Sequence, residues 1–294
     1  MSTWCVIVNQ TTCKTGWKKW KSFLDEHSIA HTMHHTHTLE EVQQVIEDSY
    51  NSGNRRFLFV GGDGTVHHGA NILLKVSGDQ SRDIIVGVLP CGTGNDWVRT
   101  FGVSKKQLAI GLKEEYTAPM NVMKVTWSDG HVHYGINMVG GGLDASVVKL
   151  LKKAPLKIPA RIIYPYGLFR ALLKSHTWKG KITIDDHHES GTWMTILAGF
   201  GKYCGGGMYM LPHAREDSPA LFMMKPKNLF KILISTPDIY TGKIIHDKRA
   251  ITYHFTKIEI EHEGEPIPLE ADGEFLGWSP VKIEAGFDVM RRIV

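Results

Sequence analysis

The chain has 294 residues, of which 42% are hydrophobic and 22% charged, a composition that excludes wholesale disorder and suits one large domain or two of ordinary size. The formal net charge of +4 is small, its basic residues are dispersed, and no recognition motif occurs, so nucleic-acid binding is not expected. The first residues run directly into a strand-like segment and no apolar run approaches about 20 residues. We therefore expect a cytoplasmic protein without a transmembrane helix.

The N-terminal part alternates strand and helix patterns. Buried strands are predicted at residues 4–8, 57–60 and 84–89. Apolar residues at helical spacing predict a helix over 18–26, and Thr38 followed by Glu41 is a capping-box pattern that begins another. Repeated strand–turn–helix units favour a parallel sheet covered by helices.

After about Pro119 the pattern becomes β-rich. Ser128-Asp129-Gly130 separates two strand-like runs and predicts a hairpin. Further strands are expected at residues 132–139, 181–184, 193–197, 251–260 and 281–283, with 181–184 and 193–197 forming a strand pair. We predict an α/β domain over 1–118, with a tail at 287–294 that packs back on it, and a mostly β, sandwich-like domain over 119–286. A basic and apolar stretch over 147–174 is expected to be helical.

The four cysteines show no CxxC pair and no disulfide-framework spacing; they are Cys5, Cys13, Cys91 and Cys204. Each lies in or beside an apolar or glycine-rich stretch. We therefore expect free, buried thiols in a reducing compartment.

Two glycine-rich turns follow predicted strands, at residues 61–65 (Gly-Gly-Asp-Gly-Thr) and 90–96 (Pro-Cys-Gly-Thr-Gly-Asn-Asp). Ligands of open α/β sheets bind at the carboxyl ends of the strands, and glycine lets a phosphate approach the backbone N–H groups closely. An acid inside a phosphate loop is explained if Mg²⁺ is bound, which makes Asp63 and Asp96 candidate metal ligands, directly or through water. The alternative is a pair of ordinary tight turns in which Asp63 caps the backbone.

These two turns resemble the nucleotide motifs of the diacylglycerol kinase catalytic family, which includes bacterial lipid kinases and sphingosine kinases. Asn9 and Lys14 lie where that family has an asparagine after the first strand and a basic residue near the phosphates. Later segments match in the family's order; they are Asn137, residues 140–145, residues 205–208, residues 212–214 and Asp272-Gly273-Glu274. The resemblance therefore extends over nearly the whole chain.

The resemblance implies an ATP-dependent lipid kinase that uses Mg²⁺ and phosphorylates diacylglycerol or a related lipid alcohol held by the β-rich domain. It implies that Asp272 is the catalytic base, and that Glu274 either orients Asp272 or helps to hold the metal. The nucleotide-binding residues that it implies are Asn9, Lys14, Gly61, Gly62, Asp63, Gly64, Thr65, Gly92, Thr93, Asn95 and Asp96. From spacing alone, Asp272-Gly273 is also typical of a solvated turn.

Several positions depart from the family pattern; they are Gln10, Cys13, His68, Asn121 and Ser218-Pro219. Of these, His68, Asn121 and Ser218 motivate the alternative of a weakly active nucleotide- or lipid-binding protein. A soluble NAD kinase-like enzyme is a further alternative. The stretch 147–174 is either a core helix with a cationic solvent face or a surface for the anionic inner membrane. The oligomeric state stays open, with a dimer among the options.

Overall fold

The structure is a computed structural model that describes residues 3–151, 177–227 and 229–294. The chain folds into two units, the first comprising Met1–Asn121 with Phe287–Val294 and the second Val122–Gly286. The chain passes between the units within strand β5 (Thr117–Trp127) and strand β18 (Val281–Ile293). In the described part of the chain, no helix is both long and apolar enough to cross a bilayer.

The first unit is built on a parallel sheet of the order β2-β1-β3-β4. Its strands are β1 (Trp4–Asn9), β2 (His31–Thr36), β3 (Arg56–Gly61) and β4 (Ile85–Pro90). The end of β18 adds a fifth parallel strand beside β4, where Arg291 pairs with Ile85. The central strands β1 and β3 are almost fully buried, as expected where helices cover both faces of a parallel sheet.

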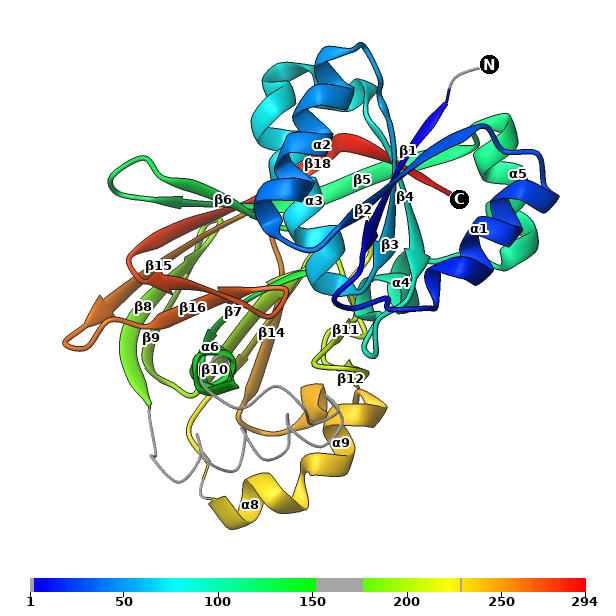
Figure 1. Cartoon of the computed structure of the whole chain (residues 1–294). Helices are drawn as coiled ribbons and strands as arrows, with labels where there is room; N and C mark the ends of the chain where they lie inside the picture. The colour runs from blue at the N-terminus through cyan, green and yellow to red at the C-terminus, as the bar shows by residue number, and fades with distance from the viewer. Residues whose placement is uncertain (1–2, 152–176, 228) are drawn as a thin grey trace. The chain divides into compact units, whose positions relative to one another are not determined.

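Helices cover both faces of this sheet, with α2 and α3 on one side and α1 and α5 on the other (Figure 1). The helices are α1 (Trp17–Glu26), α2 (Leu39–Asn51), α3 (Asp63–Ser77), α4 (Asp96–Phe101) and α5 (Lys105–Glu114), with a 3₁₀ turn at Gly78–Asp83. The Thr38 hydroxyl accepts from the Glu41 N–H at the start of α2. The Glu41 carboxylate returns to the N–H of His37 and not to that of Thr38, so the capping-box prediction is confirmed for one of its two bonds.

The second unit is mostly antiparallel β. One sheet has the order β14-β13-β10-β7-β16-β17, and β15 pairs with β8 and with residues 281–284 of β18. The strands are β6 (Val132–Gly135), β7 (Met138–Gly142), β8 (Trp178–Ile184), β9 (His187–Trp193), β10 (Thr195–Gly199), β11 (Tyr203–Cys204), β12 (Met208–Tyr209), β13 (Ala220–Met224), β14 (Ala250–His254), β15 (Lys257–Glu263), β16 (Pro268–Ala271) and β17 (Glu274–Trp278). Its helices are α6 (Leu143–Leu151), α8 (Leu229–Ile234), α9 (Thr236–Thr241) and a 3₁₀ turn at Lys243–His246. The predicted fold class, α/β followed by mostly β, is confirmed.

Three strand predictions in this unit were wrong, two in the bounds of the strands and one in their pairing. The run 132–139 is two strands, because strand pairing is interrupted at Ile136–Asn137. The N–H groups of these two residues donate to the carboxylate of Asp272 instead of to a neighbouring strand. The run 251–260 is also two strands, β14 and β15, which belong to different sheets. Residues 181–184 pair with β9 and not with 193–197, since a turn at Asp185 reverses the chain at once. The hairpin at 128–130 is confirmed by the β5–β6 pairing.

The predicted helical stretch 147–174 is described only at its beginning. Residues up to Leu151 belong to α6, and 152–174 lie outside the described residues.

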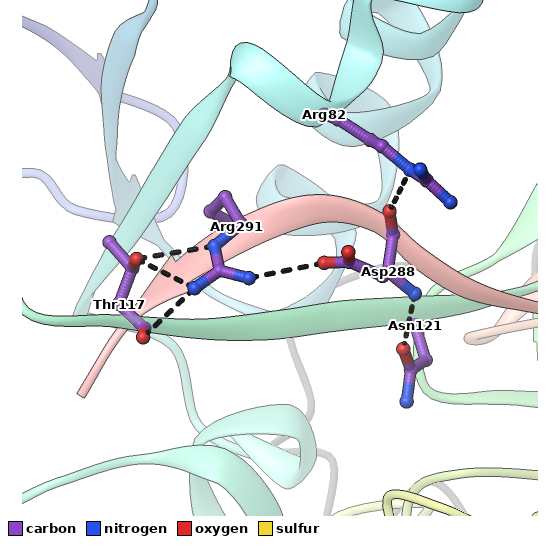
Figure 2. Close-up of polar contacts among 5 residues, drawn as sticks. All are labelled: Arg82, Thr117, Asn121, Asp288 and Arg291. Atoms are coloured by element: carbon purple, nitrogen blue, oxygen red, sulfur yellow. Dashed lines mark hydrogen bonds and ion pairs between the residues drawn. The ribbon is translucent and has the colours of Figure 1, made fainter.

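Asn121, one of the departures from the family pattern, has a structural role in the first unit (Figure 2). Its Oδ1 accepts from the N–H of Asp288, 2.8 Å away, and so ties β5 to β18. Asp288 is held with φ of +52° and also accepts from Arg291 through its carboxylate, at 3.2 Å. The Arg291 guanidinium donates to the hydroxyl and the carbonyl of Thr117 on β5, and Arg82 donates to the Asp288 carbonyl. An acceptor oxygen is what this position requires, and both asparagine and aspartate supply one.

Candidate functional site

Asn9 connects the end of β1 to the first glycine-rich turn. Its Nδ2 donates to the Thr65 hydroxyl at 3.0 Å, and its Oδ1 accepts from the Thr12 N–H at 3.1 Å. Its carbonyl accepts from the Cys13 N–H. The family asparagine therefore orders the loop that carries Lys14, and it fixes the hydroxyl of Thr65.

The first turn is the link between β3 and α3. A side chain at Gly61 would collide with Thr65, so this position requires glycine. The carbonyl of Gly62 accepts the N–H groups of Thr65 and Val66 as α3 begins at Asp63. The N-terminus of this 15-residue helix carries a partial positive charge that favours an anion.

The second turn packs directly on the first. The Cys91 N–H donates to the Gly61 carbonyl at 2.8 Å, and a Cβ at Gly92 would lie 2.6 Å from the Gly62 Cα. Asn95 takes the left-handed conformation, with φ of +53°, and its Nδ2 donates to the Gly92 carbonyl. The structure thus brings the two predicted loops together, with Gly64 in the first and Thr93 in the second.

The two predicted magnesium ligands both have protein partners. Asp63 Oδ1 accepts from the Trp97 N–H at 3.0 Å, near the start of α4. Asp96 is only 5% exposed and its Oδ1 lies 3.6 Å from Arg99 Nε. Among the described residues, no group of three or more His, Cys, Asp or Glu side chains is arranged to hold a metal. The carboxylates of Asp63 and Asp96 are too few to hold a metal by protein ligands alone. They suit Mg²⁺, which would complete its coordination shell with phosphate oxygens and water.

A cavity of about 750 Å³ opens in the first unit beside the second turn. Its lining includes the predicted residues Lys14, Gly92 and Asn95, and also Lys19 and Lys105, which the sequence did not single out. The Trp20 indole donates to the Pro90 carbonyl at 3.1 Å, and Lys19 and Lys105 lie 5.2 and 5.7 Å from its ring centroid. Three lysines around one hollow attract a polyanion. Lys19 lies on the amphipathic helix α1, but nothing in the local pattern indicated Lys105.

The expectation of four free thiols was wrong for two of them. Cys13 and Cys91 form a disulfide, with their Cα atoms 5.5 Å apart, whereas Cys5 and Cys204 are not disulfide-bonded. The two bonded cysteines are separated by 78 positions, so only the packing of the loop after β1 against the loop after β4 brings them together. The bond joins two loops that line the same cavity.

Thiol titration should give two reactive cysteines in the denatured, unreduced protein and four after reduction, because only one pair is bonded. Cys13→Ser should lower the free energy of unfolding by about 4 kcal/mol, the loop-closure estimate for a bond of this span. Cys204→Ser, which leaves the bond intact, is the matched control. Four reactive thiols without reductant would contradict the pairing.

In the second unit, Asp272 and Gly273 form the two-residue turn between β16 and β17. Their φ angles are +51° and +88°, as in a type I′ hairpin. The Asp272 carboxylate accepts three backbone N–H groups, from Ile136 at 2.7 Å, Asn137 at 2.9 Å and Met138 at 2.8 Å. These three bonds fix the orientation of the carboxylate. Glu274 opens β17 and is partly buried.

Two further acids near this turn were not predicted to belong to the site. Burial raises the pKa of Asp144, at the start of α6, to about 6, although the Thr195 hydroxyl that donates to it acts in the opposite direction. Burial also raises the pKa of Glu270, on β16, to about 8. Asp144 lies in the stretch 140–145 that matches a family motif, whereas no local sequence signal marked Glu270. The burial of both acids is a tertiary property.

Comparison with known proteins identifies the family. The profile described as "Diacylglycerol kinase catalytic domain" matches residues 3–125. The profile described as "YegS C-terminal NAD kinase beta sandwich-like domain" matches residues 137–293.

Individual relatives agree with these profiles. "Putative lipid kinase YtlR" of Bacillus subtilis is 26% identical over 315 residues, covering 99% of this chain and 99% of its own. "Probable lipid kinase YegS-like" of Pseudomonas aeruginosa is 25% identical over 182 residues, covering 62% of this chain and 57% of that protein. A crystal structure from Bacillus anthracis, described as a "putative diacylglycerol kinase", superposes with a TM-score of 0.77 at 21% identity and covers 99% of this chain and 95% of its own; at that identity the likeness shows the fold. The chain therefore belongs to the lipid-kinase-like family that joins a diacylglycerol kinase catalytic domain to a YegS-type C-terminal domain.

Proposed function

We propose that this protein transfers the γ-phosphate of ATP to the hydroxyl of a lipid alcohol, diacylglycerol or a related lipid. The observation that carries the proposal is the pair of glycine-rich turns that pack on each other in the first unit, each leading into a helix. Their backbones offer a phosphate site, and Lys14, Lys19 and Lys105 add positive charge beside the second turn.

In this proposal each group has a defined task. Backbone N–H groups within 61–64 and 92–95 hold the phosphates, and the hydroxyls of Thr65 and Thr93 donate to phosphate oxygens. Asp63 and Asp96 would hold Mg²⁺, which when bound neutralises phosphate charge. Asp272, whose carboxylate is oriented by three N–H groups, accepts the proton of the lipid hydroxyl, and Glu274 adjoins it on the same hairpin.

The direct test is a transfer assay with labelled ATP and Mg²⁺ against a panel of lipid alcohols in mixed micelles. We expect a labelled phospholipid product with diacylglycerol or a related lipid, and none without Mg²⁺. NAD belongs in the same panel, since the C-terminal profile is described as NAD kinase-like. Transfer to NAD alone, or ATP binding without transfer to any acceptor, would contradict the proposal.

The lysines around the cavity give a test of the nucleotide site. Lys14→Met and Lys105→Met should each weaken ATP binding about 10-fold, because each removes one charge-assisted contact to phosphate. Lys113→Met, an exposed lysine of α5 that does not line the cavity, is the matched control. Isothermal titration measures the dissociation constants, and equal affinities for all three variants would place the triphosphate elsewhere.

We also propose that the protein acts peripherally at the anionic inner membrane surface, through the basic and apolar stretch 147–174. The sequence of this stretch combines lysines and arginines with aliphatic and aromatic residues. Sedimentation with liposomes should show binding that rises with the fraction of anionic lipid and falls with salt. Absence of binding at low salt would contradict this part of the proposal.

A further inference from the structure

Glu270 is a buried acid in the middle of β16. It is 6% exposed, and β16 lies between β7 and β17 in the sheet. Its cross-strand partner on β7 is Gly140, where a side chain would collide with the Glu270 carboxyl. The carboxyl therefore lies over the backbone of β7, in space that this glycine leaves open.

The carboxyl of Glu270 has a defined partner in the adjoining turn. Its Oε2 accepts from the Gly273 N–H at 2.8 Å. Gly273 and Asp272 are the two turn residues with positive φ. Because the bond holds Gly273, it stabilises the conformation of this turn. The Asp272 side chain in turn accepts from Ile136, Asn137 and Met138. Glu270 is thus connected to the start of β7 in two steps. It bonds to Gly273, and the neighbouring turn residue Asp272 bonds to residues 136–138.

Burial is the main cause that raises the pKa of Glu270 to about 8. Among the described residues, Asp144 from α6, Asp272 from the turn and Glu274 from β17 raise it further. At neutral pH the side chain is therefore mostly the uncharged acid, which still accepts the Gly273 N–H. Above pH 8 it ionises and repels the carboxylates of the turn.

We propose that Glu270 is a positioning residue, which holds the Asp272-Gly273-Glu274 turn in place through the Gly273 N–H and so fixes the orientation of the Asp272 carboxylate. The catalytic consequence rests on the proposed function, in which Asp272 is the base. The structural consequence does not, because it concerns only hydrogen bonds within the second unit. In this scheme a neutral side chain that accepts one hydrogen bond is sufficient at position 270.

Two substitutions separate the hydrogen bond from the charge. Glu270→Gln keeps an acceptor oxygen and cannot ionise, whereas Glu270→Met fills a similar space without an acceptor. Hydrogen exchange of the Ile136, Asn137 and Met138 amides, corrected for intrinsic rates, reports how firmly Asp272 is held. At pH 7 we expect these amides to exchange at least about 10-fold faster in Glu270→Met, because that variant loses one buried hydrogen bond. In Glu270→Gln they should exchange at the wild-type rate. Above pH 8 the wild type should lose protection and Glu270→Gln should keep it.

Turnover provides the second readout on the same proteins. Glu270→Met should lower kcat about 10-fold. The kcat of the wild type is expected to fall above pH 8, whereas Glu270→Gln should keep the wild-type kcat at pH 7 and show no such fall. Wild-type exchange in Glu270→Met overturns the positioning role. If Glu270→Met does not fold, the wild type and Glu270→Gln decide the question. The positioning role is overturned if Glu270→Gln loses amide protection above pH 8 as the wild type does. A wild type without lipid turnover would refute the proposed function, while amide exchange still decides the role of Glu270.

Discussion

Replacing Asp272 with asparagine should lower kcat by about 10²- to 10⁴-fold, the range expected when a catalytic base is removed. The affinity for ATP should stay within about twofold, because the residues proposed to bind the triphosphate all belong to the first unit. Single-turnover phosphate transfer and ATP titration measure the two quantities. A variant that keeps near-normal turnover would show that another group accepts the proton.

The same substitution also disturbs the structure, and its effect must be separated from the loss of the base. The asparagine oxygen can still accept from Asn137 and Met138. The amide NH₂ of the asparagine then faces the N–H of Ile136, and two donors cannot bond to each other. The free energy of unfolding should therefore fall by about 1–3 kcal/mol. Activity is best measured at a temperature where denaturation curves show the variant fully folded. Asp185→Asn, which changes a carboxylate that accepts N–H groups from Thr256 and Lys257 at another hairpin, is a control for turn disruption.

Replacing Glu270 with glutamine should stabilise the protein, by an amount that grows with pH. Burial and three neighbouring acids raise the pKa of Glu270 to about 8 in the folded state, well above about 4.3 in the unfolded chain. The folded state therefore binds more protons than the unfolded state between these values. The stability of the wild type falls as pH rises through this window and levels off above pH 8.

Glutamine removes this dependence on pH. The two proteins should be about equally stable near pH 4.5, and at pH 8 the variant should gain on the order of 3–5 kcal/mol, at 1.36 kcal/mol per pKa unit. Urea unfolding monitored at several pH values measures the difference. Glu259→Gln, a substitution in an exposed ion pair with Lys257, is the control and should change stability little. An equal effect of Glu270→Gln at pH 5 and pH 8 would show that Glu270 does not ionise in this range.

The order of elements and the positions of the two glycine-rich turns were predictable from local sequence. Buried strands that end in glycine-rich turns are visible as apolar runs followed by residues that permit close backbone approach. The structure explains why these residue types are needed, since Gly61 must make room for Thr65 and Gly92 must lie against Gly62. The matches to family motifs added Asp272 and Glu274, which spacing alone does not distinguish from a solvated turn.

The bounds of the β strands were less predictable, because strand patterns do not show where a chain leaves a sheet. The breaks at Ile136–Asn137 and at 255–256 occur inside runs that look continuous. At the first break the N–H groups bind the carboxylate of Asp272, which is 136 and 135 positions away. A pattern read over a few residues contains no information about such a distant partner.

The sequence by itself determined the fold class and family, and it marked the turns at 61–65 and 90–96, because these depend on local periodicity and on residue types at fixed spacing. Tertiary structure alone decided the Cys13–Cys91 disulfide, the three amides around Asp272, and the burial of Glu270 opposite Gly140. Each of these depends on segments that are distant in the chain and adjacent in space. Burial and the approach of distant groups change a residue's pKa and its bonding, and neither is encoded at the residue itself.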